Sequence, residues 1–164
     1  MNESSQEAIH KETSSNHSEK LVSPISIMLT SAPKVGFASQ QNSVALIKEL
    51  SIENKSDHAL EDLRLTITST PLVIEEKSWV IERIDAGTVI NISDRDIKLN
   101  AEKLFALNEH ISAELVIQVT SKSEEDKGQQ ITIASASKKL EVLPKSHWGG
   151  DWLYGRIVTS ILYA

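Results

Sequence analysis

The sequence of 164 residues contains no cysteine, which excludes disulfides, thiol chemistry and zinc sites built from cysteine. Aromatic residues make up only 4% of the chain, and there are six glycines and four prolines. None of the glycines begins a phosphate-binding Gly-x-x-x-x-Gly-Lys-[Ser/Thr] loop, and no serine stands in a Gly-x-Ser-x-Gly elbow. We therefore expect a chain that is not an enzyme and uses no cofactor.

Long apolar runs and basic clusters are also missing. No run approaches the roughly 20 apolar residues of a membrane helix, and the start of the chain lacks the features of a secretory signal. The formal net charge is −6, and Lys138-Lys139 is the only adjacent basic pair, which argues against direct nucleic-acid binding. These absences predict a cytoplasmic protein that binds no membrane.

The histidines and carboxylates do not form a metal-binding pattern. No two histidines have the i, i+4 or His-x-His spacing of a metal site, and Asp94 and Asp96 lie in a predicted loop without the glycine-punctuated repeat of a calcium site. We expect solvated side chains at these positions and no bound metal. The five histidines are His10, His17, His58, His110 and His147.

Alternation of apolar and polar residues is the dominant pattern in the chain. In residues 111–120 the apolar side chains stand at every second position, which is typical of a strand with one buried and one solvated face. We predict an all-β fold, an immunoglobulin-like antiparallel β-sandwich of seven to eight strands with a disordered N-terminal tail. The predicted strands are residues 25–30, 44–54, 60–70, 77–84, 89–99 (one strand or two), 111–120 and 131–143.

Local signals refine these strands. Lys48 breaks the alternation of its strand, which indicates a bulge or a lysine stem along the surface, and Pro71 ends the next strand. Gly87 is predicted in a turn with positive φ, and Asn100 as the cap of one helical turn over residues 101–107. A break is predicted in the last strand around residues 135–137.

The composition divides the chain into three parts. Residues 1–21 are polar, with too few apolar side chains to offset the entropy of ordering, and are predicted to be a disordered tail. Residues 22–145 form the β-sandwich domain, and residues 146–164 an aromatic junction with a short apolar end.

Within residues 146–164, the seven residues 148–154 contain three aromatic side chains, and this segment, called the aromatic junction from here on, is the candidate interaction site. One interpretation is that Trp148 folds back over the open end of the sandwich; the other is that the junction docks the sandwich on a neighbouring domain or protein partner. The candidate site residues are Trp148, Gly149, Gly150, Trp152 and Tyr154.

The order of four segments carries a resemblance to a known family. These segments are residues 50–69, 77–84, 96–100 and above all 140–150, which read Leu-Glu-Val-Leu-Pro-Lys-Ser-His-Trp-Gly-Gly. Together they resemble the N-terminal domain of large bacterial superfamily-one helicase-like proteins. The resemblance implies that a long ATP-dependent helicase region follows the Trp-Gly-Gly element. No residue here matches the family's ATP site, so the resemblance also implies a truncated product.

Two hypotheses follow from these observations. In the first, the chain is a non-catalytic accessory domain that positions a helicase motor or recruits a protein partner, and the isolated chain has an exposed or self-associating aromatic junction and no ATPase activity. In the second, it is a free-standing immunoglobulin-like module that binds protein through an edge strand or loop end, with residues 146–164 folded onto the sandwich. A third hypothesis, nucleic-acid contact within a helicase, is opposed by the net charge.

Overall fold

The computed structural model describes residues 23–122 and 129–146, which contain eight strands and two short helices. The predicted disordered tail, residues 1–21, lies outside the described residues. The strands are β1 (Ile25–Ser31), β2 (Lys34–Gly36), β3 (Ile47–Asn54), β4 (Leu60–Thr70), β5 (Lys77–Ile84), β6 (Val89–Asn91), β7 (Ile111–Lys122) and β8 (Gln130–Leu143), and the helices are α1 (Phe37–Gln41) and α2 (Ala101–Ala106).

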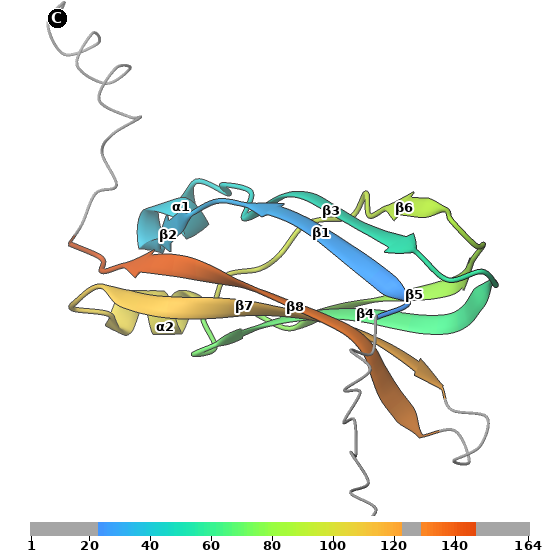
Figure 1. Cartoon of the computed structure of the whole chain (residues 1–164). Helices are drawn as coiled ribbons and strands as arrows, with labels where there is room; N and C mark the ends of the chain where they lie inside the picture. Colours follow the sequence, from blue (N-terminus) through green and yellow to red (C-terminus); the bar gives the residue numbers. More distant parts are fainter. Residues whose placement is uncertain (1–22, 123–128, 147–164) are drawn as a thin grey trace, which may run out of the picture.

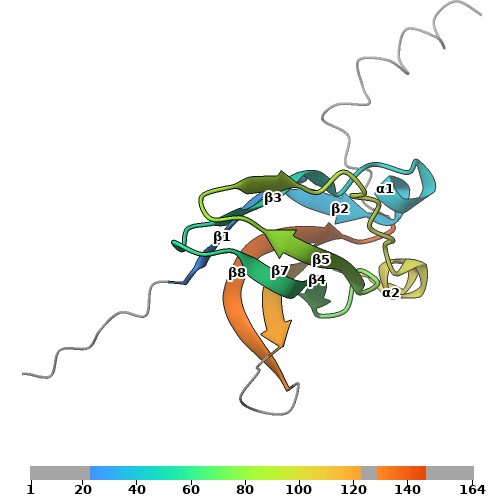
Figure 2. The same cartoon turned by 90° about the vertical axis from the view of Figure 1, so that its right-hand side faces the viewer.

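The strands form two sheets that face each other. Sheet A has the order β1-β3-β6, and sheet B has the order β2-β8-β7-β4-β5. Figures 1 and 2 show the two sheets as layers, with sheet B curled so that its long strands β7 and β8 reach beyond sheet A. The predicted all-β architecture with two sheets is therefore confirmed.

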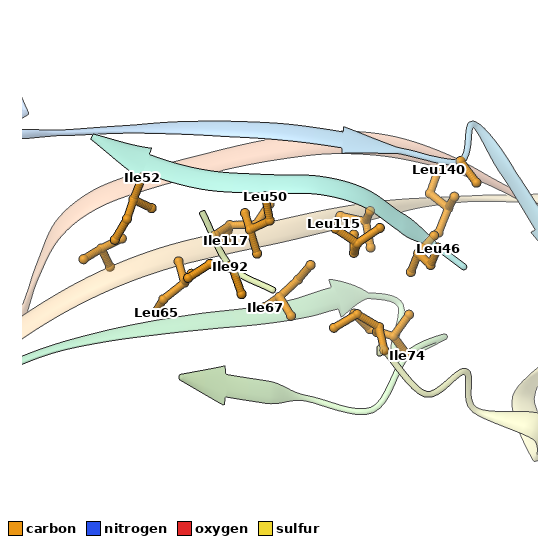
Figure 3. Close-up of a cluster of buried hydrophobic side chains, with 14 of the residues drawn as sticks. Leu46, Leu50, Ile52, Leu65, Ile67, Ile74, Ile92, Leu115, Ile117 and Leu140 are labelled. Carbon is orange, nitrogen blue, oxygen red and sulfur yellow. The ribbon is translucent and has the colours of Figure 1, made fainter. Parts of the chain in front are cut away.

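Because side chains alternate along a strand, every second residue of the long strands faces the core between the two sheets (Figure 3). In β4 the residues Leu63, Leu65 and Ile67 are buried, as predicted, while the residues between them are more accessible. In β7 the buried residues continue at Ala113, Leu115, Ile117 and Val119. The bounds of β4 and β5 agree with the prediction at both ends.

The prediction of a wholly antiparallel sandwich is wrong, because β2 runs parallel to β8. The chain changes sheets just before β2: the Ala32 amide still donates to Leu46 of the sheet A side at 2.8 Å, whereas the Pro33 carbonyl accepts from the Glu141 amide of β8 at 3.0 Å. β2 thus continues in the direction of β1, which is also the direction of β8. Sheet B is a mixed sheet for this reason.

One predicted irregularity is confirmed and one is wrong. The pairing of β1 with β3 steps from Thr30↔Glu49 to Ser31↔Ile47 and so skips Lys48, the position of the predicted bulge. β8, in contrast, pairs with β7 without a break through residues 135–137. Its register shift lies at Ile133, between the pairs Val119↔Ala134 and Thr120↔Thr132. The small residues 135–137 therefore did not indicate where the pairing of β8 with β7 becomes irregular.

The sandwich has two ends of different construction (Figure 1). We call the end with α1, α2 and residues 143–146 the helix end. We call the opposite end, with the β3–β4 turn (residues 55–59) and the β5–β6 turn (residues 85–88), the turn end. No helix within the described ranges is both long and apolar enough to cross a membrane.

Candidate functional site at the helix end

The sequence-predicted site residues Trp148, Gly149, Gly150, Trp152 and Tyr154 lie outside the described residues. The last described residues bring the chain to the helix end, since β8 ends at Leu143 and residues 144–146 follow it there. The candidate site therefore consists of the side chains that surround residues 144–146 at the helix end.

An aromatic pair with a lysine above it lies at the helix end. Phe37 of α1 and Phe105 of α2 meet edge to face, with their ring centroids 5.5 Å apart. The ammonium group of Lys145, two residues after β8, lies 4.5 Å from the centroid of the Phe105 ring. Phe105 nevertheless remains 55% exposed. These three residues, Phe37, Phe105 and Lys145, are the helix-end patch.

The local sequence of α2 explains why Phe105 points outward. Asn100 caps the helix, as predicted: its side-chain oxygen accepts a hydrogen bond from the Lys103 amide at 3.0 Å. Leu104 is fully buried and is the only buried residue of this six-residue helix. Because the helix is anchored through Leu104, the following side chain, Phe105, projects away from the core.

An open groove of about 580 Å³ lies beside the helix-end patch, between α1 and the start of α2. Ser39 and Gln40 line one side, and the chain from Asp96 to Glu102 lines the other. Glu75 also contributes to its wall, so carboxylates outnumber the single lysine, Lys98, in the lining. The helix end thus combines an exposed apolar ring with an acidic groove.

Charged side chains on β2 and β8 border the helix end. Glu141 pairs with Lys34 Nζ at 3.2 Å and with His110 Nδ1 at 3.2 Å. The pKa of Glu141 lies below its ordinary value because Lys34 and then His110 hydrogen-bond to its carboxylate. All three side chains are at least 40% exposed, so this is a surface network in which Lys34 forms an ion pair with Glu141 and His110 adds a hydrogen bond.

The turn end is organised around a buried asparagine. Asn54 is fully buried at the end of β3, and its amide nitrogen donates to the carbonyls of His58 at 2.8 Å and Ile84 at 3.1 Å. Its side-chain oxygen accepts from the amide and the hydroxyl of Ser56, at 3.0 and 2.6 Å. The Asn54 carbonyl also accepts from the Gly87 amide at 2.9 Å. One side chain therefore ties sheet A to β5 of sheet B.

Surface pairs surround this asparagine. Asp57 lies 2.8 Å from His58 Nδ1, and this hydrogen bond holds the pKa of the Asp57 carboxyl below its usual range. Arg83 binds Asp85 at 2.7 Å and Glu61 at 2.6 Å, and both carboxylates raise the pKa of its guanidinium. These polar contacts join the two turns to β3, β4 and β5, and Gly87 turns the chain there at φ +68°, as predicted.

The comparisons with known proteins give no identification. No protein-family model matches the chain, and no curated protein matches it. The helicase resemblance therefore remains a hypothesis. Among residues 23–122 and 129–146, no group of three or more His, Asp or Glu side chains could hold a metal ion.

Sequence reasoning missed the helix-end patch because its parts are distant in sequence. Residues 31–41 contain neither alternation nor a helical period, so β2, α1 and Phe37 had no signal. Phe105 lay in a predicted helical turn, and only its place beside buried Leu104 could have marked it as the exposed member.

Proposed function

We propose that the chain is a non-catalytic interaction domain that presents its helix end to a neighbouring domain or protein partner. The observation that carries this proposal is Phe105, a large apolar ring that is 55% exposed beside Lys145, close to the last described residue. Exposed aromatic rings beside a polar rim are typical of protein-binding surfaces. In this proposal the domain acts in the cytoplasm, and the aromatic junction, residues 148–154, belongs to the same interaction region.

An immunoglobulin-like topology is part of the proposal. Sheet A has the order β1-β3-β6, and sheet B places β8, β7, β4 and β5 side by side. This order supports an assignment to strands A, B and E opposite G, F, C and C′ of a variable-type immunoglobulin domain. In such domains the two ends carry the connections, so binding at one end of the sandwich suits the topology.

A superfamily-one helicase-like motor is the partner that the sequence resemblance suggests. On this hypothesis the sandwich is an accessory domain that positions the motor, and the isolated chain hydrolyses no ATP. Hydrolysis of ATP by the pure 164-residue chain, abolished when the chain is unfolded, would contradict the non-catalytic assignment.

The second candidate function is binding through an edge strand. β5 lies at the edge of sheet B, and Val80 on this strand is 69% exposed. An added strand on β5 would bind by backbone hydrogen bonds, as in other modes of β-strand addition. The charged residues Lys77, Glu82 and Arg83 on β5 disfavour such pairing, which is why the helix end is preferred.

A photo-cross-linking amino acid distinguishes the two surfaces. Placed at Phe105 or, in a separate strain, at Val80, it reports which surface contacts another protein in the source cells. We expect discrete protein adducts from position 105 and few from position 80. Adducts from position 80 alone would favour the edge-strand module, and adducts from neither would contradict an interaction domain.

A further inference from the structure

We infer that the aromatic junction of this chain, residues 148–154, docks on the helix-end patch of its own sandwich. Trp148 or Trp152 would pack on Phe105 and so set the direction in which any following chain leaves the domain. The inference rests on the proposed function, because it names how the helix end joins the sandwich to its neighbour.

The distribution of aromatic residues supports this occupant. The chain has two phenylalanines, three tryptophans and two tyrosines, and both phenylalanines lie in the helix-end patch. Four of the remaining five aromatic residues follow residue 147, at positions 148, 152, 154 and 163, and only Trp79 lies elsewhere. Aromatic rings prefer edge-to-face or offset contacts with one another, and the Phe37–Phe105 pair already has the edge-to-face geometry.

The chain is already at the patch when the junction begins. Lys145 lies over the Phe105 ring, and Trp148 follows only three residues later. Three extended residues span roughly 10 Å, so Trp148 is within reach of the exposed part of the ring without rearrangement of β8. Gly149-Gly150 then allows the turn that would bring Trp152 back toward α2, since glycine adopts conformations closed to other residues.

The tether favours docking within one chain over docking between two. A short flexible linker holds its ligand at an effective concentration on the order of millimolar, well above the concentration of a second copy in dilute solution. The segment of the same chain therefore occupies the patch first, and exchange between two copies requires a high protein concentration.

Disulfide trapping tests this contact. Because the sequence contains no cysteine, the only thiols are the two that are introduced. Ala101 lies one helical turn before Phe105 on the exposed surface of α2, so Ala101→Cys places a thiol beside the patch without removing the ring. Combined with Asp151→Cys in the full chain, which leaves both glycines in place, it should form an intramolecular disulfide under mild oxidation. The matched control adds Phe105→Ala to the same cysteine pair, which should oxidise at least about ten times more slowly, because the tether is unchanged and only the docking contact is lost.

Tryptophan fluorescence provides the second measurement. In a Trp79→Phe background the emission comes only from Trp148 and Trp152. Adding Phe105→Ala should shift this emission to longer wavelength and increase its quenching by acrylamide, whereas Met28→Ala, at a 62% exposed residue of sheet A, should change neither.

The outcomes separate this inference from the proposed function. Equal disulfide rates with and without Phe105→Ala, together with tryptophan emission that Phe105→Ala does not change, would overturn the docking. A disulfide-linked dimer in place of the intramolecular product would overturn docking within one chain. Partner adducts at position 105 in cells, together with either result, would leave the interaction domain standing; trapped docking without any adduct would instead remove the partner.

Discussion

The two ends of the sandwich differ in the side chains that they bury and expose. At the turn end, buried Asn54 uses both its amide donors and its oxygen within the domain, and the charged residues around it pair with each other. At the helix end, a phenylalanine stays largely exposed above a short helix, beside an acidic groove. Under the proposed function, the buried network at the turn end stabilises the fold and the exposed ring at the helix end belongs to the binding surface.

Adjacent residues of α2 provide the largest contrast. Leu104→Ala should lower the free energy of unfolding by about 3 kcal/mol, because it leaves a cavity under the helix at a fully buried site. Phe105→Ala, one residue on, should lower it by less than about 1 kcal/mol, because the ring is already half exposed. Urea unfolding measures both. Equal losses would mean that Phe105 is a core residue and not part of a binding surface.

Two asparagines, one at each end, provide the next contrast. Asn54→Ala should cost about 2 kcal/mol, because the buried Ile84 carbonyl loses its donor and the Ser56 turn loses its acceptor. Asn42→Ala is the matched control: its side chain also donates to a carbonyl, that of Ala38 at 2.8 Å, but in an exposed position after α1. Thermal unfolding of the two variants should therefore show a clear drop in Tm for the first and little change for the second.

The turn at Gly87 tests how rigid the turn end is. Gly87→Ala should cost about 1 kcal/mol from backbone strain alone, because φ is +68° while a new Cβ would meet no atom within 4 Å. Gly87→Asn should cost less, since asparagine tolerates this conformation better than alanine. An alanine variant as stable as the parent protein would show that the turn relaxes freely, against the account of a closed end.

The smallest effect concerns carboxyl titration. The folded pKa of Glu141 is lowered by its hydrogen bonds from Lys34 and His110, so these contacts add stability above the unfolded value of 4.5, and this stability is lost as pH falls through the folded pKa. Lys34→Met should raise the Glu141 pKa toward 4.5, because it removes the main cause of the shift. The pKa of Asp57 at the turn end depends on His58 and should not change. Carboxyl carbon shifts followed by NMR measure both groups, and an unchanged Glu141 would contradict the assignment.

Much of the fold could be predicted from alternation and turn chemistry. The bounds of β4 and β5, the bulge at Lys48 and the cap at Asn100 each follow from a local signal. The passage of the chain from β1 in sheet A to β2 in sheet B could not be predicted. The three residues of β2 are too few to show an apolar–polar alternation, and the parallel partner strand, β8, lies far away in the sequence. Asn54 was predicted as the last residue of a strand but not as a buried one, because hydrophobic patterning gives no sign that a polar side chain is buried.

Only one part of the candidate interaction region could be predicted from the sequence. The aromatic junction at residues 148–154 stands out in composition, whereas Phe37 and Phe105 are single residues whose pairing depends on the packing of α1 against α2. Local signals identify a cluster of aromatic residues in the sequence but give no sign that Phe37 and Phe105 pack against each other.

Hydrogen exchange in the full chain tests the contrast between the ends most directly. The parent protein is compared with the double variant Trp148→Ala, Trp152→Ala, which keeps the chain length and the whole sandwich. The account predicts faster exchange in α1 and α2 of the variant, at amides such as those of Asn42 and Leu104, and no change around residues 54–58 and 85–88. Identical exchange at the helix end in the two proteins would contradict the claim that this end is the binding surface of the junction.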